Sequence, residues 1–226
     1  MSVRMTVTTS ATPMYIDAAR RFAESAERLD NCDQFDALDS PGKELRASQL
    51  VDAALAAVLT ANSAVEAMVN DLFVERILFP AANSGPWFKG LSKDVTAAFA
   101  DSWNGGTEWR NLVTKCHIAA DIAGKPRMNF GSGYAQRMTL LIDLRNTLIH
   151  HKPISVEHGL EPLKSNDALE RSLHQQFERS RICDNSYTFR WYGCLGAGCA
   201  RWAHETTAGF IREFFKHFGV SYYMPI

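Results

Sequence analysis

Residues 136–153 read QRMTLLIDLRNTLIHHKP, and this stretch combines a helical pattern with reactive side chains near its end. At about 100° per residue, its apolar side chains fill one broad arc of a helix. The arc consists of Met138, Leu140, Leu141, Ile142, Leu144, Leu148 and Ile149. A narrow polar stripe consists of Thr139, Asp143, Asn146 and His150. The pattern predicts an amphipathic helix with a functional site at its C-terminal end.

Arg145 projects inside the apolar arc, between Leu141 and Ile149. Its guanidinium cannot lose its proton, so it needs an anion or an acceptor there to offset its lost hydration. Asn146 and His150 are four residues apart and are therefore neighbours on the helix surface. An Arg, an Asn and a His at one helix end suit a phosphodiester, because they offer acid–base and anion-stabilising roles.

The end of this helix is predicted by Pro153, which disfavours a helical conformation at Lys152. The helix should then end one turn after His150. That places the imidazole near free carbonyls at the negative end of the helix dipole.

Residues 145–150, RNTLIH, resemble the signature of the HEPN superfamily, small all-helical domains with Arg, a polar residue, three variable residues and His. Residues 63–72, SAVEAMVNDL, on an earlier helix are also similar to that family. The resemblance implies cleavage of RNA without metal or cofactor, by attack of a 2′-hydroxyl that leaves a 2′,3′-cyclic phosphate. His150 would be the general acid or base, Arg145 would stabilise the phosphorane, and Asn146 would orient His150 or the phosphate.

Further expectations come from the same resemblance. HEPN domains pair through the motif helix, which implies a homodimer whose two copies of Arg145 and His150 line one cleft. Members are often toxins or antiviral effectors, with a cognate antitoxin or regulatory protein as a partner. The alternative is a non-catalytic HEPN-like module that binds a nucleotide or a protein. Toxins silenced by nucleotidyl transfer carry a Tyr where this chain has Lys152, which argues against that mode of control.

A polar line runs along the earlier helix, where Asn62, Glu66 and Asn70 follow at intervals of four. One interpretation has Glu66 facing Arg145 across the helix pair and supporting it together with Asn70. The other interpretation is solvent exposure or a structural hydrogen-bond ladder.

The whole chain predicts an all-α bundle of five to seven helices with at most one short extended segment. Residues 1–12 should be a flexible tail and residues 13–226 a single domain. Loops are expected at residues 31–42 and 80–90, and an alternating pattern at residues 187–192 marks the one extended segment. The helices are expected at residues 13–29, 44–77, 91–103, 107–123, 136–152, 162–181 and 195–218.

Composition limits the cellular location and the modes of RNA binding that we expect. Charges interrupt the apolar runs, no signal-peptide core is evident and the five cysteines form no regular framework, so we expect a cytoplasmic protein without a membrane segment. The net charge of −1 provides no global basic field for nucleic acid. Contacts to RNA must therefore be local, and Arg127, Arg137, Arg145 and Lys152 could supply them.

Three competing sites carry less weight. Cys183, Cys194, Cys199 and His204 loosely match a zinc site, although Cys194 and Cys199 would diverge on a helix. Cys116 and His117 are adjacent on a helix and so cannot face each other as a nucleophile pair. The aromatic group of Trp87, Phe88, Trp103 and Trp109 is more typical of a core than of a base-stacking surface.

Overall fold

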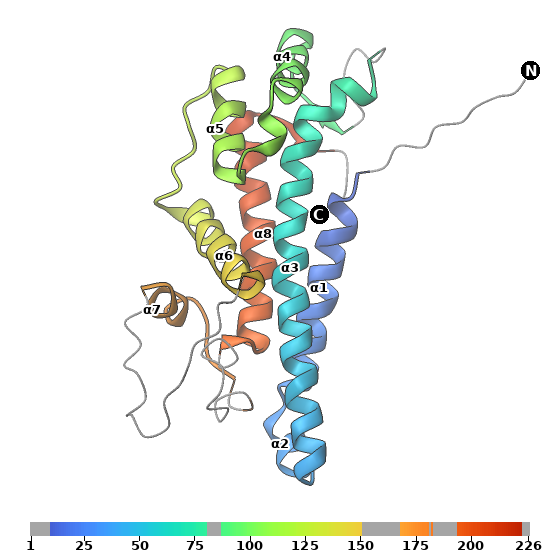
Figure 1. Ribbon diagram of the computed structural model, residues 1–226, viewed down its shortest axis with the longest axis vertical. Helices are drawn as coiled ribbons and strands as arrows, with labels where there is room; N and C mark the ends of the chain where they lie inside the picture. The colour runs from blue at the N-terminus through green and yellow to red at the C-terminus, as the bar shows by residue number, and fades with distance from the viewer. Residues whose placement is uncertain (1–9, 81–86, 151–167, 181, 183–193, 223–226) are drawn as a thin grey trace, which may run out of the picture.

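The computed structural model describes residues 10–80, 87–150, 168–180, 182 and 194–222 (Figure 1). The described residues form eight α-helices, one 3-10 helix and one pair of short antiparallel strands. In chain order these are α1 (Thr12–Leu29), α2 (Cys32–Asp36), α3 (Ser40–Leu78), β1 (Phe88–Lys89), α4 (Lys93–Asn104), η1 (Thr107–Trp109), α5 (Leu112–Ile122), α6 (Gly133–Ile149), α7 (Ala168–His174), α8 (Ala197–Phe218) and β2 (Ser221–Tyr222). The predicted all-α class is confirmed, with more helices and one more extended segment than expected.

The long helix α3 is the axis of the bundle, and α1 and α8 pack along it (Figure 1). Small residues dominate the faces that meet: α1 buries Ala19, Ala23 and Ala26, and α3 buries seven turns of mostly Ala, Val and Leu side chains. Small side chains let helix backbones approach closely, while the branched residues fill the remaining space. The helices α4 and α5 lie toward the C-terminal end of α3, and α6 crosses toward its middle (Figure 1).

Helix α3 also contains a stretch that could cross a membrane by length and composition, with a mean hydropathy of 1.4 over 18 residues. No membrane segment was expected from the sequence, because Glu66 interrupts the apolar run although it lowers the mean hydropathy little. In the structure 56% of this window is buried against the rest of the protein, as expected for a core helix of a bundle.

Several predicted boundaries are wrong for local reasons. The predicted loop at residues 31–42 contains α2 and the start of α3, because Asn31 and Asp39 cap these helices with their side chains. The single helix expected over residues 107–123 is divided into η1 and α5, since Asn111 accepts the Thr114 N–H at 2.9 Å and starts a new helix. Of the helix expected at 162–181, α7 covers residues 168–174, residues 175–180 are not helical, and residues 162–167 and 181 lie outside the described residues. Residues 187–192 also lie outside the described residues.

The N-terminal boundary also differs from the prediction. Residues 1–9 of the expected tail lie outside the described part of the chain. Ser10 and Thr12, however, both donate hydrogen bonds to Asp71 Oδ2 on α3, and Thr12 is buried. Residues 10–12 are therefore attached to the bundle rather than part of a free arm.

A buried carboxylate holds the segment after α3 in place. Glu75 Oε1 accepts the backbone N–H groups of Trp87 at 2.6 Å and Phe88 at 2.9 Å. Phe88 and Lys89 then pair with Tyr222 and Ser221 in the β1–β2 ribbon. This links the end of α3 to the chain that leaves α8.

Candidate functional site

Helix α6 is docked on α3 by its middle turns. Met138, Leu141 and Leu144 are buried, and Asn62 of α3 donates from Nδ2 to the Leu141 carbonyl at 3.2 Å. The last turn leaves the core, because Asn146 is exposed and Ile149 is 48% exposed. The predicted motif residues therefore sit at the rim of the bundle.

The structure brings Arg145, Asn146 and His150 together at this helix end. Arg145 is half-buried, and its Nη1 donates to Asn146 Oδ1 at 2.9 Å. His150 is exposed and is the C-cap residue, and its backbone N–H donates to the Asn146 carbonyl at 2.9 Å. The helix thus ends at Ile149 rather than beyond His150, while Pro153 lies outside the described residues.

The Arg145 guanidinium keeps its charge available. In the described part of the chain, no carboxylate oxygen lies within 4.0 Å of it, and its hydrogen bond goes to a neutral amide. A guanidinium has five N–H donors in a fork, so donors remain for an incoming anion. An imidazole open to solvent one turn away adds a group that can carry a proton.

The expected contact between Glu66 and Arg145 is wrong. Asn62 of α3 hydrogen-bonds to α6, whereas Glu66 and Asn70 lie farther along α3, beside α5. There they line a hollow of about 270 Å³, which we call the Lys115 hollow. Its lining residues are Glu66, Asn70, Glu108, Trp109, Arg110, Leu112 and Lys115.

Lys115 is the unusual residue of this hollow, because it is only 8% exposed. Its Nζ donates to Asn70 Oδ1 at 2.8 Å and lies 5.1 Å from the centre of the Trp103 ring. Burial lowers the pKa of the Lys115 ammonium, and the charges of Glu66 and Glu108 act against that shift. Lys115 was not predicted from the sequence, although its place between the apolar residues Leu112 and Ala119 on the buried face of α5 was a signal.

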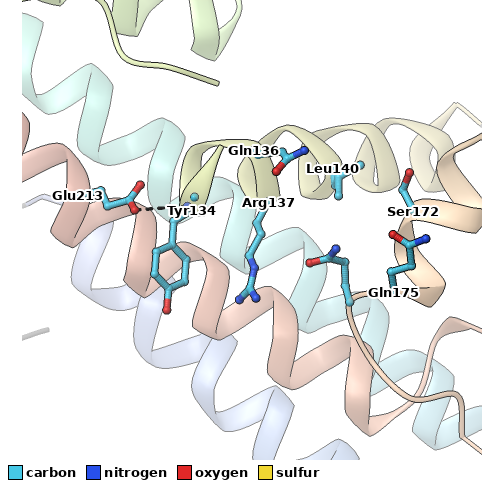
Figure 2. Close-up of a pocket in the computed structure, with 9 residues that line it drawn as sticks. Tyr134, Gln136, Arg137, Leu140, Ser172, Gln175 and Glu213 are labelled. Atoms are coloured by element: carbon cyan, nitrogen blue, oxygen red, sulfur yellow. Dashed lines mark hydrogen bonds between the residues drawn. The ribbon is translucent and has the colours of Figure 1, made fainter. Parts of the chain in front are cut away.

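A second hollow of about 560 Å³ lies at the other end of α6, between α6, α7 and α8 (Figure 2). Arg137 stacks over the Tyr134 ring at 5.4 Å, and the Tyr134 N–H donates to Glu213 Oε1 at 3.4 Å. In the view of Figure 2, Arg137 and Gln175 extend into the space between the helices. Gly209 of α8 leaves room for the Tyr134 ring, since a Cβ there would collide with it.

The other basic residues expected near the motif differ in whether a carboxylate already pairs with their charge. Arg127 forms two hydrogen bonds to the Asp121 carboxylate, at 2.7 and 3.1 Å, so its charge is compensated. Lys152 lies outside the described residues. Arg137 remains as the second cation of α6 without a carboxylate within 4.0 Å in the ranges that the structure describes.

The competing sites find little support in the geometry. Cys183 lies outside the described residues, and among those described no three His, Cys, Asp or Glu side chains gather as metal ligands. Burial raises the pKa of the Cys199 thiol, and it raises that of Cys116 to about 12, which disfavours a thiolate at neutral pH. The His117 ring packs edge-on against Phe130.

The aromatic group divides into two kinds of residue. Trp87 and Phe88 are buried, as a core role predicts, and Trp103 packs against Phe73. Trp109 is 83% exposed at the edge of the Lys115 hollow.

The chain matches no protein-family model, no curated protein and no solved structure.

Proposed function

We propose that this protein is a metal-independent endoribonuclease whose active site comprises Arg145, Asn146 and His150. One observation carries the proposal: a guanidinium held by a neutral amide, with no carboxylate beside it in the described residues, lies at the same helix end as an open imidazole. A cation fixed in this way binds a phosphate, and a nearby imidazole transfers protons.

The reaction needs one proton removed and one proton added. A histidine takes the proton of the RNA 2′-hydroxyl while that oxygen bonds to the adjacent phosphorus. The bond from phosphorus to the 5′-oxygen breaks, and that oxygen receives a proton from an acid, which yields a 2′,3′-cyclic phosphate and a 5′-hydroxyl. Arg145 donates to the non-bridging oxygens as charge develops on them, and Asn146 holds Arg145 in position.

A homodimer would supply both proton-transfer groups. Two copies that meet through the exposed end of α6 bring two His150 side chains to one cleft, one as base and the other as acid. The exposed Ile149 in this turn offers an apolar contact for such a pairing. We further propose a cytoplasmic toxin or phage-defence effector, restrained by a cognate antitoxin or another regulatory protein.

The second candidate is a non-catalytic module that binds a nucleotide or a protein. It is favoured by the hollow that contains Arg137, because about 560 Å³ lies within the range of small-molecule sites. In that case Arg145 and His150 would contribute to binding alone.

Cleavage in the presence of excess EDTA tests the proposal. The purified chain should cut single-stranded or structured RNA, and mass spectrometry should find 2′,3′-cyclic phosphate ends. His150→Ala should lower the rate by about 10²- to 10⁴-fold. Thr147→Ala is the matched control, because Thr147 lies in the same turn and donates only to the Asp143 carbonyl. Strict dependence on added metal, or full activity in His150→Ala, would favour the binding module instead.

A further inference from the structure

The Lys115 hollow combines a buried cation with unused hydrogen-bonding capacity. Lys115 is the one Lys or Arg among the described residues that is buried. Burying an ammonium is costly unless it is compensated, and here Asn70 and the Trp103 ring supply that compensation. An ammonium has three N–H donors, and Asn70 accepts one of them.

Two carboxylates line the same hollow, but neither forms an ion pair with the Lys115 amine in the described residues. The charges of Glu66 and Glu108 act on Lys115, yet neither carboxylate lies within 4.0 Å of its Nζ where the chain is described. A donor and two acceptors thus face one space of about 270 Å³. That volume is below the range of about 300–1,000 Å³ for drug-sized ligands, which suits a single ring system.

Trp109 adds a stacking surface to this space. Its 83% exposure is the highest among the large hydrophobic residues of the described chain. Its helix, η1, is fixed by the hydrogen bond of 2.7 Å between the hydroxyls of Ser102 and Thr107. An exposed indole beside hydrogen-bonding groups is how proteins hold an unstacked nucleobase.

We infer that the Lys115 hollow binds a guanine base. The base stacks on Trp109, its O6 accepts from Lys115 Nζ, and its N1–H and N2–H groups donate to the carboxylate of Glu66 or Glu108. Guanine presents an acceptor next to two donors on one edge, which complements an amine next to a carboxylate. Adenine presents an amino donor where guanine has O6, so this amino group would face the Lys115 amine, which is also a donor.

The source of the base is either a free guanine nucleotide or a nucleotide within an RNA strand. In the second case the inference rests on the proposed function and specifies its substrate, an RNA with an unpaired guanine. Asn70 in the hollow and Asn62 at the α6 junction are separated by eight residues, about 12 Å along α3. At about 3.4 Å per stacked nucleotide, a strand of at least four nucleotides joins the hollow to Leu141, and the proposed cleavage site begins one helical turn beyond, at Arg145.

Binding can be measured separately from cleavage. Calorimetric titrations of the full chain carrying His150→Ala would use GMP, AMP, CMP and UMP, and then short single strands that differ by one G or A. Whichever set of ligands binds, mononucleotides or strands, we expect the affinity for the guanine ligand to exceed that for the adenine ligand by about 5- to 150-fold. Comparable affinity for GMP and the strand assigns the free nucleotide, and a clear gain for the strand assigns RNA.

Substitutions in the hollow assign the preference to its residues. Trp109→Ala should weaken guanine binding by about 5- to 150-fold, since stacking is lost. Glu66→Gln together with Glu108→Gln should remove the preference over adenine. Phe22→Ala, an exposed aromatic of α1, and Glu44→Gln, an exposed carboxylate of α3, are the matched controls and should change neither quantity.

Several outcomes would overturn the inference. Equal binding of guanine and adenine, no binding of any mononucleotide or strand, or full binding in Trp109→Ala would each do so. Each substituted residue is exposed, so these variants should fold even where Lys115→Met does not. Guanine binding without cleavage by the unsubstituted chain would retain this site and reject the nuclease, whereas cleavage without base preference would do the reverse.

Discussion

Arg145 lies on the helix that the sequence predicted, but its surroundings differ from those expected. Its place in the apolar arc suggested that an acidic partner offsets its burial, but the residue is half-buried and its guanidinium donates to the neutral amide of Asn146. Because α6 leaves the core at this turn, the arc is exposed where Arg145 and Ile149 lie. Periodicity defines the face of a helix, but it does not show where along its length the neighbouring helices end.

Substitution of Arg145 separates its charge from its geometry. Arg145→Lys keeps a positive charge but removes the planar fork that donates to Asn146 and that, in the proposed site, would also donate to a phosphate oxygen. We expect cleavage to fall by about 10- to 150-fold, the value of one hydrogen bond to a charged group. The measurement is the single-turnover rate on RNA.

Thermal melts of the alanine variants provide the companion test at this site. Arg145→Ala should lower the melting temperature more than His150→Ala, because the Arg145 stem is half-buried and His150 is exposed. Wild-type rates in Arg145→Lys would show that a point charge suffices, and equal melting temperatures would show that the Arg145 stem contributes no packing.

Among the elements, the long helices were predictable and the long-range contacts were not. Helices α1 and α8 begin and end within about two residues of their predicted bounds, because their buried faces repeat with the helical period. The β1–β2 pairing escaped prediction, since each strand has two residues and its partner lies more than 130 positions away. Glu66 was assigned the wrong neighbour because the spacing cannot tell which of α5 and α6 packs against each turn of α3.

Glu75 provides a pH test of the contact between α3 and β1. Burial raises the pKa of this carboxyl above 4.5, while the N–H groups of Phe88 and Trp87 act in the opposite direction. A raised folded-state pKa favours the folded state most below the unfolded value, and this contribution is lost as the pH rises through the folded value. Glu75→Gln can keep both hydrogen bonds without a charge, so its stability should depend less on pH from about 4.5 upward.

Urea unfolding at a series of pH values measures this effect. Glu75→Ala removes the carboxylate that accepts two backbone N–H groups and should lower the free energy of unfolding by about 1–3 kcal/mol. Glu44→Gln on the exposed face of α3 is the control for loss of a carboxylate. A Glu75→Gln curve parallel to the wild-type curve would show that the buried carboxyl keeps its ordinary pKa.

For the whole molecule, basic and acidic residues nearly balance, and the cations of the proposed sites lie at separate points. The net charge is −1, and Arg127 is paired with Asp121. Arg145 and Arg137 lie near opposite ends of α6, and Lys115 lies on α5. If the protein is the proposed ribonuclease, it should bind RNA at specific points instead of through a general field. Salt should then weaken its binding to RNA less steeply than it weakens the binding of a basic RNA-binding domain.

The final prediction concerns dimer formation. Two residues of the predicted apolar arc, Leu141 and Ile149, differ in their exposure. Leu141 is fully buried in one chain, so it cannot be a contact between copies, whereas Ile149 is 48% exposed beside the motif. If two copies pair through the end of α6, Ile149→Asp should convert a dimer to a monomer, which light scattering measures. The melting temperature of each chain should stay unchanged. Leu141→Asp should unfold the chain instead, because it buries a charge in the core. Leu45→Asp, which changes a 61% exposed leucine on α3, is the matched control. A dimer that survives Ile149→Asp would place the interface elsewhere, and a monomer that retains full cleavage would show that one His150 suffices for both proton transfers.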